Sequence, residues 1–320
     1  MSSQIPTIDF SDVDPSNPGT KLWNTVRGQV MDALTSMGCF EALYPSVTPE
    51  LRDALFGSAV KDLFALPLET KLLNSYGPEK PFHGYLGNIP GLDNYESLAI
   101  TDAPRPQEVR RFADLMWPDG NPSFCETALR LAEQFARLEE MVYRMVLESL
   151  GVFNYHAAQT ESNWSLLRFS QYTAPNGEEK NLGYISHQDT NTLSIVCQNQ
   201  VDGLEVQTKN GQWILVTPSQ ASLIVMAGNA FRAWTNGRVY APFHRILVGG
   251  EVTRYSAIFF SIPGENLMIQ APEELVDEEH PSLFKPYDYN EFVSFCVSKE
   301  SAGREDKLEA FCGVSATRLS

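Results

Sequence analysis

The chain has 320 residues, of which 43% are hydrophobic, and it carries a formal net charge of −16 at pH 7. That charge argues against nucleic acids and anionic membranes as partners, because both require a positive surface, and no apolar run approaches the roughly 18 residues of a membrane helix. The N-terminus lacks the basic and apolar regions of a secretory signal, so we expect a cytoplasmic protein. The five cysteines show no Cys-x-x-Cys spacing, and we expect them to be free thiols. We further expect a monomer that binds a small molecule.

The first half of the chain has mainly helical periodicity. After a first strand in Ile5–Phe10, apolar residues recur at helical spacing over 22–37 and stop at Gly38. A second helix is expected over 49–65. The segment 76–106 contains glycine, proline and aromatic residues without a clear period, which is typical of a lid or a binding loop.

The longest predicted helix runs from Ser123 to Leu150. Ser123 and Glu126 have the spacing of a capping box, and Gly151 supplies the C-terminal stop. Its apolar positions keep helical phase, so the helix should pack against a sheet. A further helical segment is expected near the C-terminus, over 288–311.

From Trp164 onward, short strands alternate with turn residues. The predicted strands are Leu166–Tyr172, Leu204–Thr208, Trp213–Val216, Ser222–Met226 and Tyr255–Ile262. Many short strands of this kind predict a sandwich or a jelly roll. We expect a mixed α and β protein that forms one compact unit. Its regions are a helical part with the first strand (1–160), a jelly-roll core (161–285) and a helical tail (286–320).

Three residues of the second half form a candidate metal site. His187 and Asp189 lie two apart in an apparent strand, so their side chains point the same way, and His244 follows at the start of a later strand. Two imidazoles and one carboxylate form the ligand set of a non-haem Fe(II) centre with an open face. His-x-Asp alone often arises by chance, but the joint pattern is much more specific. The remaining histidines, which are more simply structural, are His83, His156 and His280.

A second constellation suggests an anion site. Arg254 and Ser256 share one face of a predicted strand, and a guanidinium beside a hydroxyl can clamp a carboxylate. The alternative is a surface arginine in a sheet. The apolar run that follows, 257–260, makes the strand look buried, and a buried arginine needs an anionic partner. Tyr172 could add a phenol hydrogen bond, while Arg245 is expected to form a supporting ion pair.

Together these motifs make the chain resemble the plant 2-oxoglutarate- and Fe(II)-dependent dioxygenases over nearly its whole length. The matching motifs are Ile5–Phe10, Gly38–Phe40, His187-x-Asp189, Trp234–Arg238, His244-Arg245 and Arg254-x-Ser256. Within that family the chain is similar to the branch of glucosinolate side-chain (alkenyl- or hydroxyalkyl-producing) dioxygenases and related specialised-metabolite hydroxylases. The segments 81–85, 95–97 and 274–281 carry this narrower likeness.

The resemblance implies a distorted double-stranded β-helix, or jelly roll, braced by the long helix and closed by a C-terminal helix. It implies that Fe(II) is bound by His187, Asp189 and His244. It further implies that Arg254 and Ser256 hold the distal carboxylate of 2-oxoglutarate, with Tyr172 beside them. The positions that it suggests for the substrate pocket are Phe260, Arg168 and Tyr95. The chain departs from the family where Asn229 and Ser170 replace a common Asp and a frequent Asn.

The implied activity is the oxidation of a small plant specialised metabolite by hydroxylation, desaturation or demethylation. The cosubstrates would be 2-oxoglutarate and O2, the products would include succinate and CO2, and ascorbate would support the activity. Two alternatives remain at this point. One keeps the metal triad but replaces 2-oxoglutarate by an ascorbate-dependent oxidase chemistry, and the other is a non-catalytic ligand-binding jelly roll.

Overall fold

The core of the protein consists of eight strands that form two facing sheets. The computed structural model describes residues 4–77, 80, 82–174, 177–265 and 267–314. The four core strands of the larger sheet are β5 (Trp164–Tyr172), β7 (Leu193–Gln198), β10 (Ser222–Ala227) and β12 (Arg254–Ile262). The smaller sheet contains β6 (Gly177–His187), β8 (Leu204–Gln207), β9 (Trp213–Leu215) and β11 (His244–Gly250).

The connectivity of these strands is that of a jelly roll. The core strands pair antiparallel in the order β10-β7-β12-β5 in the larger sheet and β6-β11-β8-β9 in the smaller sheet. The chain therefore passes from one sheet to the other at almost every connection, as in a double-stranded β-helix. The predicted mixed α and β fold with a jelly-roll core is confirmed.

Four strands from the first half of the chain extend the larger sheet. At one edge lie β1 (Thr7–Asp9) and β2 (Cys39–Leu43), and at the other lie β4 (Tyr95–Thr101) and β3 (Leu86–Gly87). The prediction that 76–106 is irregular throughout was wrong, because β4 pairs with β5 along its whole length. Most residues of β4 are buried, so the strand lacks the alternation of apolar and polar residues that reveals a half-exposed strand.

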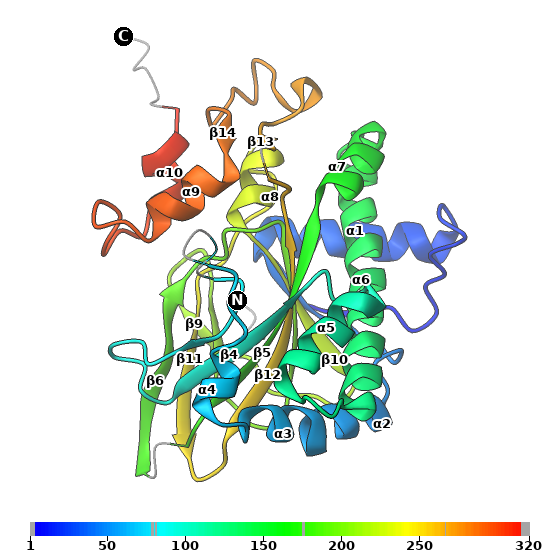
Figure 1. Ribbon diagram of the computed structural model, residues 1–320. Helices are drawn as coiled ribbons and strands as arrows, with labels where there is room; N and C mark the ends of the chain where they lie inside the picture. Colours follow the sequence, from blue (N-terminus) through cyan, green and yellow to red (C-terminus); the bar gives the residue numbers. More distant parts are fainter. Residues whose placement is uncertain (1–3, 78–79, 81, 175–176, 266, 315–320) are drawn as a thin grey trace.

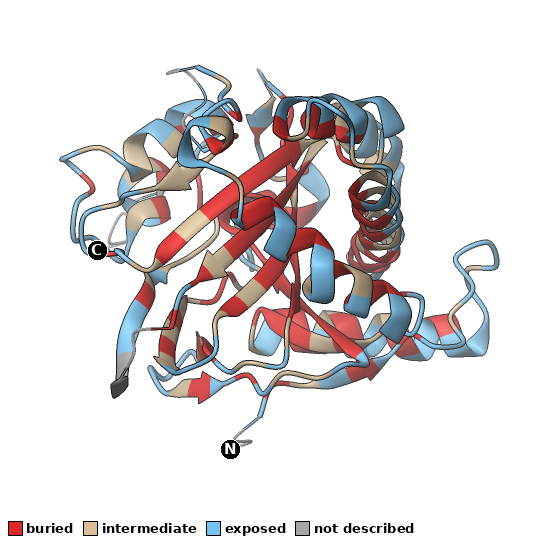
Figure 2. Cartoon of the chain, turned by 60° about the horizontal axis from the view of Figure 1, so that its bottom comes forward, coloured by how far each residue is buried: buried red, intermediate tan, exposed pale blue. Residues whose placement is uncertain are grey.

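The long helix α6 (Pro122–Ser149) covers the outer face of the larger sheet (Figure 1). Its Phe135 meets Phe259 of β12 edge-on at 6.1 Å between ring centroids, and Phe124 meets Phe169 of β5 at 5.8 Å. The helix α6 also contacts α1 (Lys21–Ser36) and α5 (Pro106–Met116), which themselves contact edge strands of the larger sheet. Figure 2 shows the buried residues concentrated along the central strands and on the helix surfaces that face them.

The expected cap of α6 was wrong. The side chain of Asn121 accepts a hydrogen bond from the backbone N–H of Phe124 at 3.0 Å, and Pro122 occupies the first helical position, so the helix begins before Ser123. Proline is favoured there because its fixed φ suits the first turn. Gly151 follows the helix with φ +72°, as predicted.

The remaining elements are short. They are α2 (Pro49–Ala54), a π-helical turn (Leu55–Ala59), α3 (Val60–Phe64), α4 (Leu68–Lys71), α7 (His156–Ser162), α8 (Asn229–Trp234), α9 (Tyr289–Cys296), α10 (Lys307–Cys312), β13 (Met268–Ile269), β14 (Tyr287–Asp288), and the 3-10 turns Phe153–Tyr155 and Glu273–Leu275. The helix predicted over 288–311 is therefore two short helices. Within the described residues, no helix is long and apolar enough to cross a bilayer.

The two faces of the larger sheet differ in chemistry. Alternate residues of β5 and β12, such as Phe169 and Phe259, face α6 and are apolar. The residues between them face the smaller sheet, and several of these are polar although they are buried: Arg168, Ser170, Tyr172, Arg254 and Ser256. Because buried polar groups are seldom placed in a sandwich interior without partners, this inward face marks the functional site.

Candidate metal centre and anion site

The side chains of His187, Asp189 and His244 converge at one end of the smaller sheet. His187 is the last residue of β6, His244 is the first residue of β11, and the two are register partners across the ladder. One possible ligand atom from each of the three side chains lies within 4.8 Å of the others. The sequence placed Asp189 on the same strand as His187, whereas β6 ends at His187. Asp189 is held instead by its backbone carbonyl, which accepts a hydrogen bond from the N–H of Asn229 at 2.8 Å.

Hydrogen bonds around the three residues direct their ligand atoms toward one point. His187 Nδ1 lies 2.8 Å from the carbonyl of Ile185, and His244 Nδ1 lies 3.4 Å from the carbonyl of Pro242. Since a carbonyl can only accept, each Nδ1 donates a proton to it, and the neutral tautomer that results has its lone pair on Nε2, where it can bind a metal. The two Nε2 atoms lie 3.5 and 3.7 Å from Asp189 Oδ1, while the hydroxyl of Ser194 donates to Asp189 Oδ2.

The electrostatics of the cluster favour the protonation states that bind a metal. Burial lowers the pKa of His244 to about 4, and the neighbouring His187 acts in the same direction. Burial alone would raise the pKa of Asp189, but His244, His187 and the Ser194 hydroxyl together hold that pKa well below its ordinary value. Near neutral pH, His244 is therefore a neutral imidazole and Asp189 is a carboxylate, as metal coordination requires.

The second site lies farther along the inward face of the larger sheet. Arg254 is 1% exposed, pairs in register with Tyr172, and its guanidinium carbon lies 4.9 Å from the centroid of the Tyr172 ring. Its Nη2 donates to Gln198 Oε1 at 2.7 Å. Within the described part of the chain, the Arg254 Nε and Nη1 atoms and the Ser256 hydroxyl have no hydrogen-bond partner. A carboxylate would satisfy these donors, because its oxygens accept bidentate hydrogen bonds from a guanidinium.

The surroundings of Arg254 fit such a ligand. Burial raises the pKa of Tyr172 to about 12, although the nearby Arg254 acts against this shift, so the phenol keeps its proton near neutral pH and can donate. Gly203 passes so close that a Cβ there would lie 2.9 Å from Arg254 Cδ. A side chain at residue 203 would therefore displace the guanidinium.

The three residues expected in the substrate pocket all lie near these sites. Phe260 is half-buried on β12 and is the register partner of Ser194, which bonds Asp189. Arg168 is 5% exposed on the inward face of β5. Tyr95 is buried on β4, and its ring lies 5.2 Å from that of Tyr172.

The sequence of this protein matches two profiles of known families. The profile of the 2OG-Fe(II) oxygenase superfamily matches residues 153–263, and a profile described as "non-haem dioxygenase in morphine synthesis N-terminal" matches residues 5–119. The Arabidopsis thaliana protein named "Probable 2-oxoglutarate-dependent dioxygenase AOP1.2" is 44% identical over 97% of this chain and 96% of its own length. The chain belongs to the 2-oxoglutarate- and Fe(II)-dependent oxygenases. The family and the enzyme class expected from the sequence are thereby confirmed.

One further relative in sequence and two solved structures are also similar to this chain. An Arabidopsis thaliana relative named "Probable inactive 2-oxoglutarate-dependent dioxygenase AOP2" is 32% identical over 98% of each chain. Among solved structures, the rice dioxygenase for auxin oxidation has a TM-score of 0.81 and 27% identity over 97% of this chain and 100% of its own. A binary complex of the Arabidopsis thaliana dioxygenase for auxin oxidation 1 with 2-oxoglutarate has a TM-score of 0.76 and 27% identity, covering 87% and 100%.

Sequence reasoning missed one aromatic residue beside the metal centre of this oxygenase. The ring of Tyr184 meets His187 edge-on at 5.0 Å and meets Tyr95 at the same distance. Tyr184 precedes His187 by three residues, so a regular strand would direct it to the opposite face. The β6–β11 ladder shifts register between His244 and Ile246, which makes Tyr184 the partner of Ile246. Such a bulge re-aims side chains and leaves no signal in the residue pattern.

The other histidines of the oxygenase lie apart from the triad. His83 stacks on Trp164 at 4.7 Å, His156 Nε2 lies 2.9 Å from Glu140, and His280 Nδ1 lies 3.0 Å from Asp277. Arg245, beside His244, forms the predicted ion pair, in which its Nε lies 2.8 Å from Glu205.

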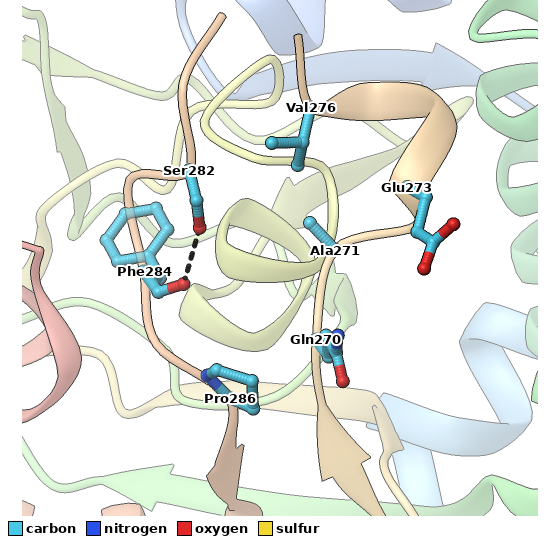
Figure 3. A pocket seen from close by; sticks show the side chains of 7 residues that line it. All are labelled: Gln270, Ala271, Glu273, Val276, Ser282, Phe284 and Pro286. Atoms are coloured by element: carbon cyan, nitrogen blue, oxygen red, sulfur yellow. Dashed lines mark hydrogen bonds between the residues drawn. The ribbon is translucent and has the colours of Figure 1, made fainter.

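A hollow of about 300 Å³ lies on the C-terminal segment (Figure 3). It is lined by Gln270, Ala271, Glu273, Val276, Ser282, Phe284 and Pro286. None of the residues of the metal triad or of the Arg254 site lines this hollow, and it offers no cation to an acidic ligand.

Proposed function

We propose that this oxygenase binds Fe(II) through His187, Asp189 and His244 and oxidises a small plant specialised metabolite by hydroxylation, desaturation or demethylation. The observation that carries the proposal is the convergence of two Nε2 lone pairs and one ionised carboxylate within 4.8 Å. Two neutral imidazoles and a carboxylate suit Fe(II) and leave coordination positions open. When bound, the iron supplies the activation of O2.

We propose further that Arg254 and Ser256 bind the distal carboxylate of 2-oxoglutarate and that Tyr172 lies beside it. The unpartnered donors of Arg254 and Ser256 support this assignment, since an unpaired buried guanidinium is strongly unfavourable. The 27% identical dioxygenase for auxin oxidation 1, solved with 2-oxoglutarate, adds support from a relative. Succinate and CO2 would then be the coproducts, and ascorbate would support turnover by keeping the iron reduced.

The protein side chains have distinct tasks in this proposal. Arg254 binds and orients the cosubstrate, and Ser194 holds the Asp189 carboxylate by donating to Oδ2. The ring of Tyr184 packs edge-on against His187, and the ring of Tyr95 packs against Tyr184. Phe260, Arg168 and Tyr95 would contact the substrate, whose position relative to the iron decides which bond is oxidised.

The two alternatives are less well supported. An ascorbate-dependent oxidase without 2-oxoglutarate would leave the Arg254 site to another anion. A non-catalytic role has a precedent in the 32% identical relative named as inactive. In this chain the complete triad, with both imidazoles oriented by carbonyls, favours catalysis.

The proposal extends to the state of the protein. We propose a monomer, because the metal triad and the Arg254 site are complete within one copy of the chain and need no residue from a second. We also propose a cytoplasmic location, because all five cysteines are free. The regions 1–160, 161–285 and 286–320 would act as one compact unit. The strands β1 to β4 support this, since they join the same sheet as the jelly-roll core.

The test is succinate release from 2-oxoglutarate by the full-length protein, loaded anaerobically with Fe(II) and then exposed to O2 and a plant metabolite extract. Succinate should form with the wild-type protein and fall to background in His187→Ala and Asp189→Ala. Ser186→Ala, at an exposed residue next to His187, is the matched control and should keep the activity. Succinate release that persists in both triad variants would overturn the iron assignment, while turnover that ignores 2-oxoglutarate would favour the oxidase alternative.

A further inference from the structure

Arg168 is a buried cation whose protein partners are all neutral. Its Nη1 donates to the hydroxyl of Ser97 at 2.7 Å and to the carbonyl of Gly84 at 3.1 Å, and its Nη2 donates to the carbonyl of Phe82. None of the ion pairs among the described residues includes Arg168, which is 5% exposed. Arginine is rarely buried to this extent without an anion.

The position of Arg168 connects it to the metal centre. It lies on the inward face of β5, four residues before Tyr172, and its partner Ser97 also accepts a hydrogen bond from the Tyr95 hydroxyl at 2.9 Å. The Tyr95 ring lies 5.0 Å from that of Tyr184, which in turn lies 5.0 Å from His187. The Tyr184 hydroxyl interacts electrostatically with both the Arg168 guanidinium and the Asp189 carboxylate. Arg168 is thus connected to the metal centre through Ser97, Tyr95 and Tyr184, and we infer that a substrate lying along this inward face contacts both.

Resting on the proposed function, we propose that Arg168 selects a substrate that carries an anionic group, either a carboxylate or a sulfate. A guanidinium has five N–H donors, and the three hydrogen bonds of Arg168 leave donors on Nη2 and Nε for a ligand. An anion would satisfy these donors and balance the charge, which hydroxyl and carbonyl oxygens cannot do.

Two other buried arginines of the chain can be compared with Arg168. Arg254, on the same inward face, is the proposed site for the carboxylate of the cosubstrate, so two buried cations would serve two anionic ligands. Arg52 is also buried with carbonyl partners, but it belongs to α2 and bonds the carbonyls of Ser219 and Ser222, outside the inward face. The net charge of −16 repels anions elsewhere on the molecule, so a local cation is needed to bind an acidic substrate.

The first experiment uses the wild-type protein alone. A plant leaf extract is divided by ion exchange into anionic, neutral and cationic fractions, and each is added to the Fe(II)-loaded protein with 2-oxoglutarate, ascorbate and O2. The anionic fraction should stimulate succinate release above the extract-free rate, and the other two should not. Stimulation by the neutral or cationic fraction alone would overturn the role of Arg168 and leave the proposed function standing. Failure of every fraction would overturn both.

Chemical treatment of the anionic fraction distinguishes the two anions. Coupling to methylamine with a carbodiimide neutralises carboxylates and leaves sulfates charged, whereas a sulfatase removes sulfates alone. Loss of stimulation after the first treatment identifies a carboxylate, and loss after the second identifies a sulfate. Stimulation that survives both treatments contradicts the proposal.

The second experiment tests the residue. In Arg168→Gln, the amount of anionic fraction needed for half-maximal succinate release should rise at least tenfold, because a charge-assisted hydrogen bond is lost. Arg168→Lys keeps the charge and should show a smaller increase. Arg111→Gln, at a side chain that is 73% exposed, is the charge-matched control and should respond as the wild type does.

A purely structural role of Arg168, in which it only holds the segment around Phe82 and Gly84 by hydrogen bonds to their carbonyls, predicts a different result. The Arg168→Gln protein would then lose folded structure or 2-oxoglutarate binding without a change in substrate preference. The KM for 2-oxoglutarate should stay within twofold of the wild type if the proposal holds. An Arg168→Gln protein that responds to the anionic fraction as the wild type does would overturn the proposal. If this variant does not fold, the wild-type fractions and Arg168→Lys still decide the question.

Discussion

His187 and His244 lie directly opposite each other across the β6–β11 ladder, with their ring centroids 4.2 Å apart. The pairing of β6 with β11 thus holds two of the proposed ligands next to each other, and their relative position does not depend on the conformation of the surrounding loops. Asp189 has no such support, because it follows the end of β6 and depends on its contacts with Asn229 and Ser194. The weakest-held member of the triad is therefore the carboxylate.

The first prediction concerns the hydroxyl that orients this carboxylate. Ser194→Ala removes the donor to Asp189 Oδ2 in a fully buried position. We expect the affinity for Fe(II) to fall by about 10- to 100-fold, which is typical when a group that orients a metal ligand is lost. Anaerobic Fe(II) titration measures this. Ser186→Ala, at an exposed serine, is the control, and equal affinities in the two variants would show that Ser194 does not support Asp189.

The second prediction concerns stabilisation by the cosubstrate. At a concentration of 100 Kd, a ligand that binds only the folded state stabilises it by about 2.7 kcal/mol, so 2-oxoglutarate should raise the Tm of the metal-loaded protein by several degrees. Arg254→Met should lose this shift, because the bidentate anchor is gone. Arg254→Lys should retain part of it. Thermal unfolding with and without 2-oxoglutarate measures the shifts, and a full shift in Arg254→Met would place the cosubstrate elsewhere.

The features that could be predicted from the sequence are those that obey strand alternation. Arg254 and Ser256 lie two apart on β12 and do share its inward face, and the buried run behind them correctly indicated a covered strand. The position of Tyr172 opposite Arg254 needed the pairing of β5 with β12, which no local pattern encodes. The sequence suggested Tyr172 only as a possible further donor to the anion, and the family resemblance implied that it lies beside the cosubstrate.

The features that could not be predicted depend on interruptions of regular structure. Tyr184 approaches His187 only because the β6–β11 register shifts, and Asp189 reaches the centre from a loop beyond the strand. The strand β4 was missed because both of its faces are covered, so its residues do not alternate. In each case tertiary contacts decide the geometry, and they leave little trace in residue spacing.

The third prediction compares two candidate caps of α6. The sequence pattern favoured Ser123, whereas the side chain of Asn121 accepts from the Phe124 N–H at 3.0 Å. Asn121→Ala should lower the free energy of unfolding by about 1 kcal/mol, because the backbone N–H of Phe124 in the first turn would lose its hydrogen-bond acceptor. Ser123→Ala, within the first turn, should change it by less than about 0.5 kcal/mol. Urea denaturation of both variants measures the difference, and a larger effect at Ser123 would restore the capping box.

The last prediction concerns a carboxyl group between α6 and the larger sheet. Burial raises the pKa of Glu139 to about 7 from an ordinary value of 4.5, while its hydrogen bond with Ser261 acts in the opposite direction. Because the folded protein holds this proton more tightly than the unfolded chain does, the stabilising contribution of Glu139 is complete below pH 4.5. It is lost as the pH rises through 7.

Glu139→Gln mimics the protonated carboxyl and should remove this dependence on pH. In the metal-free protein at pH 8, the free energy of unfolding of the variant, measured by urea denaturation, should exceed that of the wild type by about 1–3 kcal/mol. At pH 5 the two free energies should be nearly equal. Glu126→Gln, on the same helix but 71% exposed, should show no such change between the two pH values. Since the residues of the triad are the same in all three proteins, their contribution cancels in the comparison. A Glu139→Gln effect of the same size at pH 5 and pH 8 would mean that the carboxyl is ionised throughout this range in the folded protein.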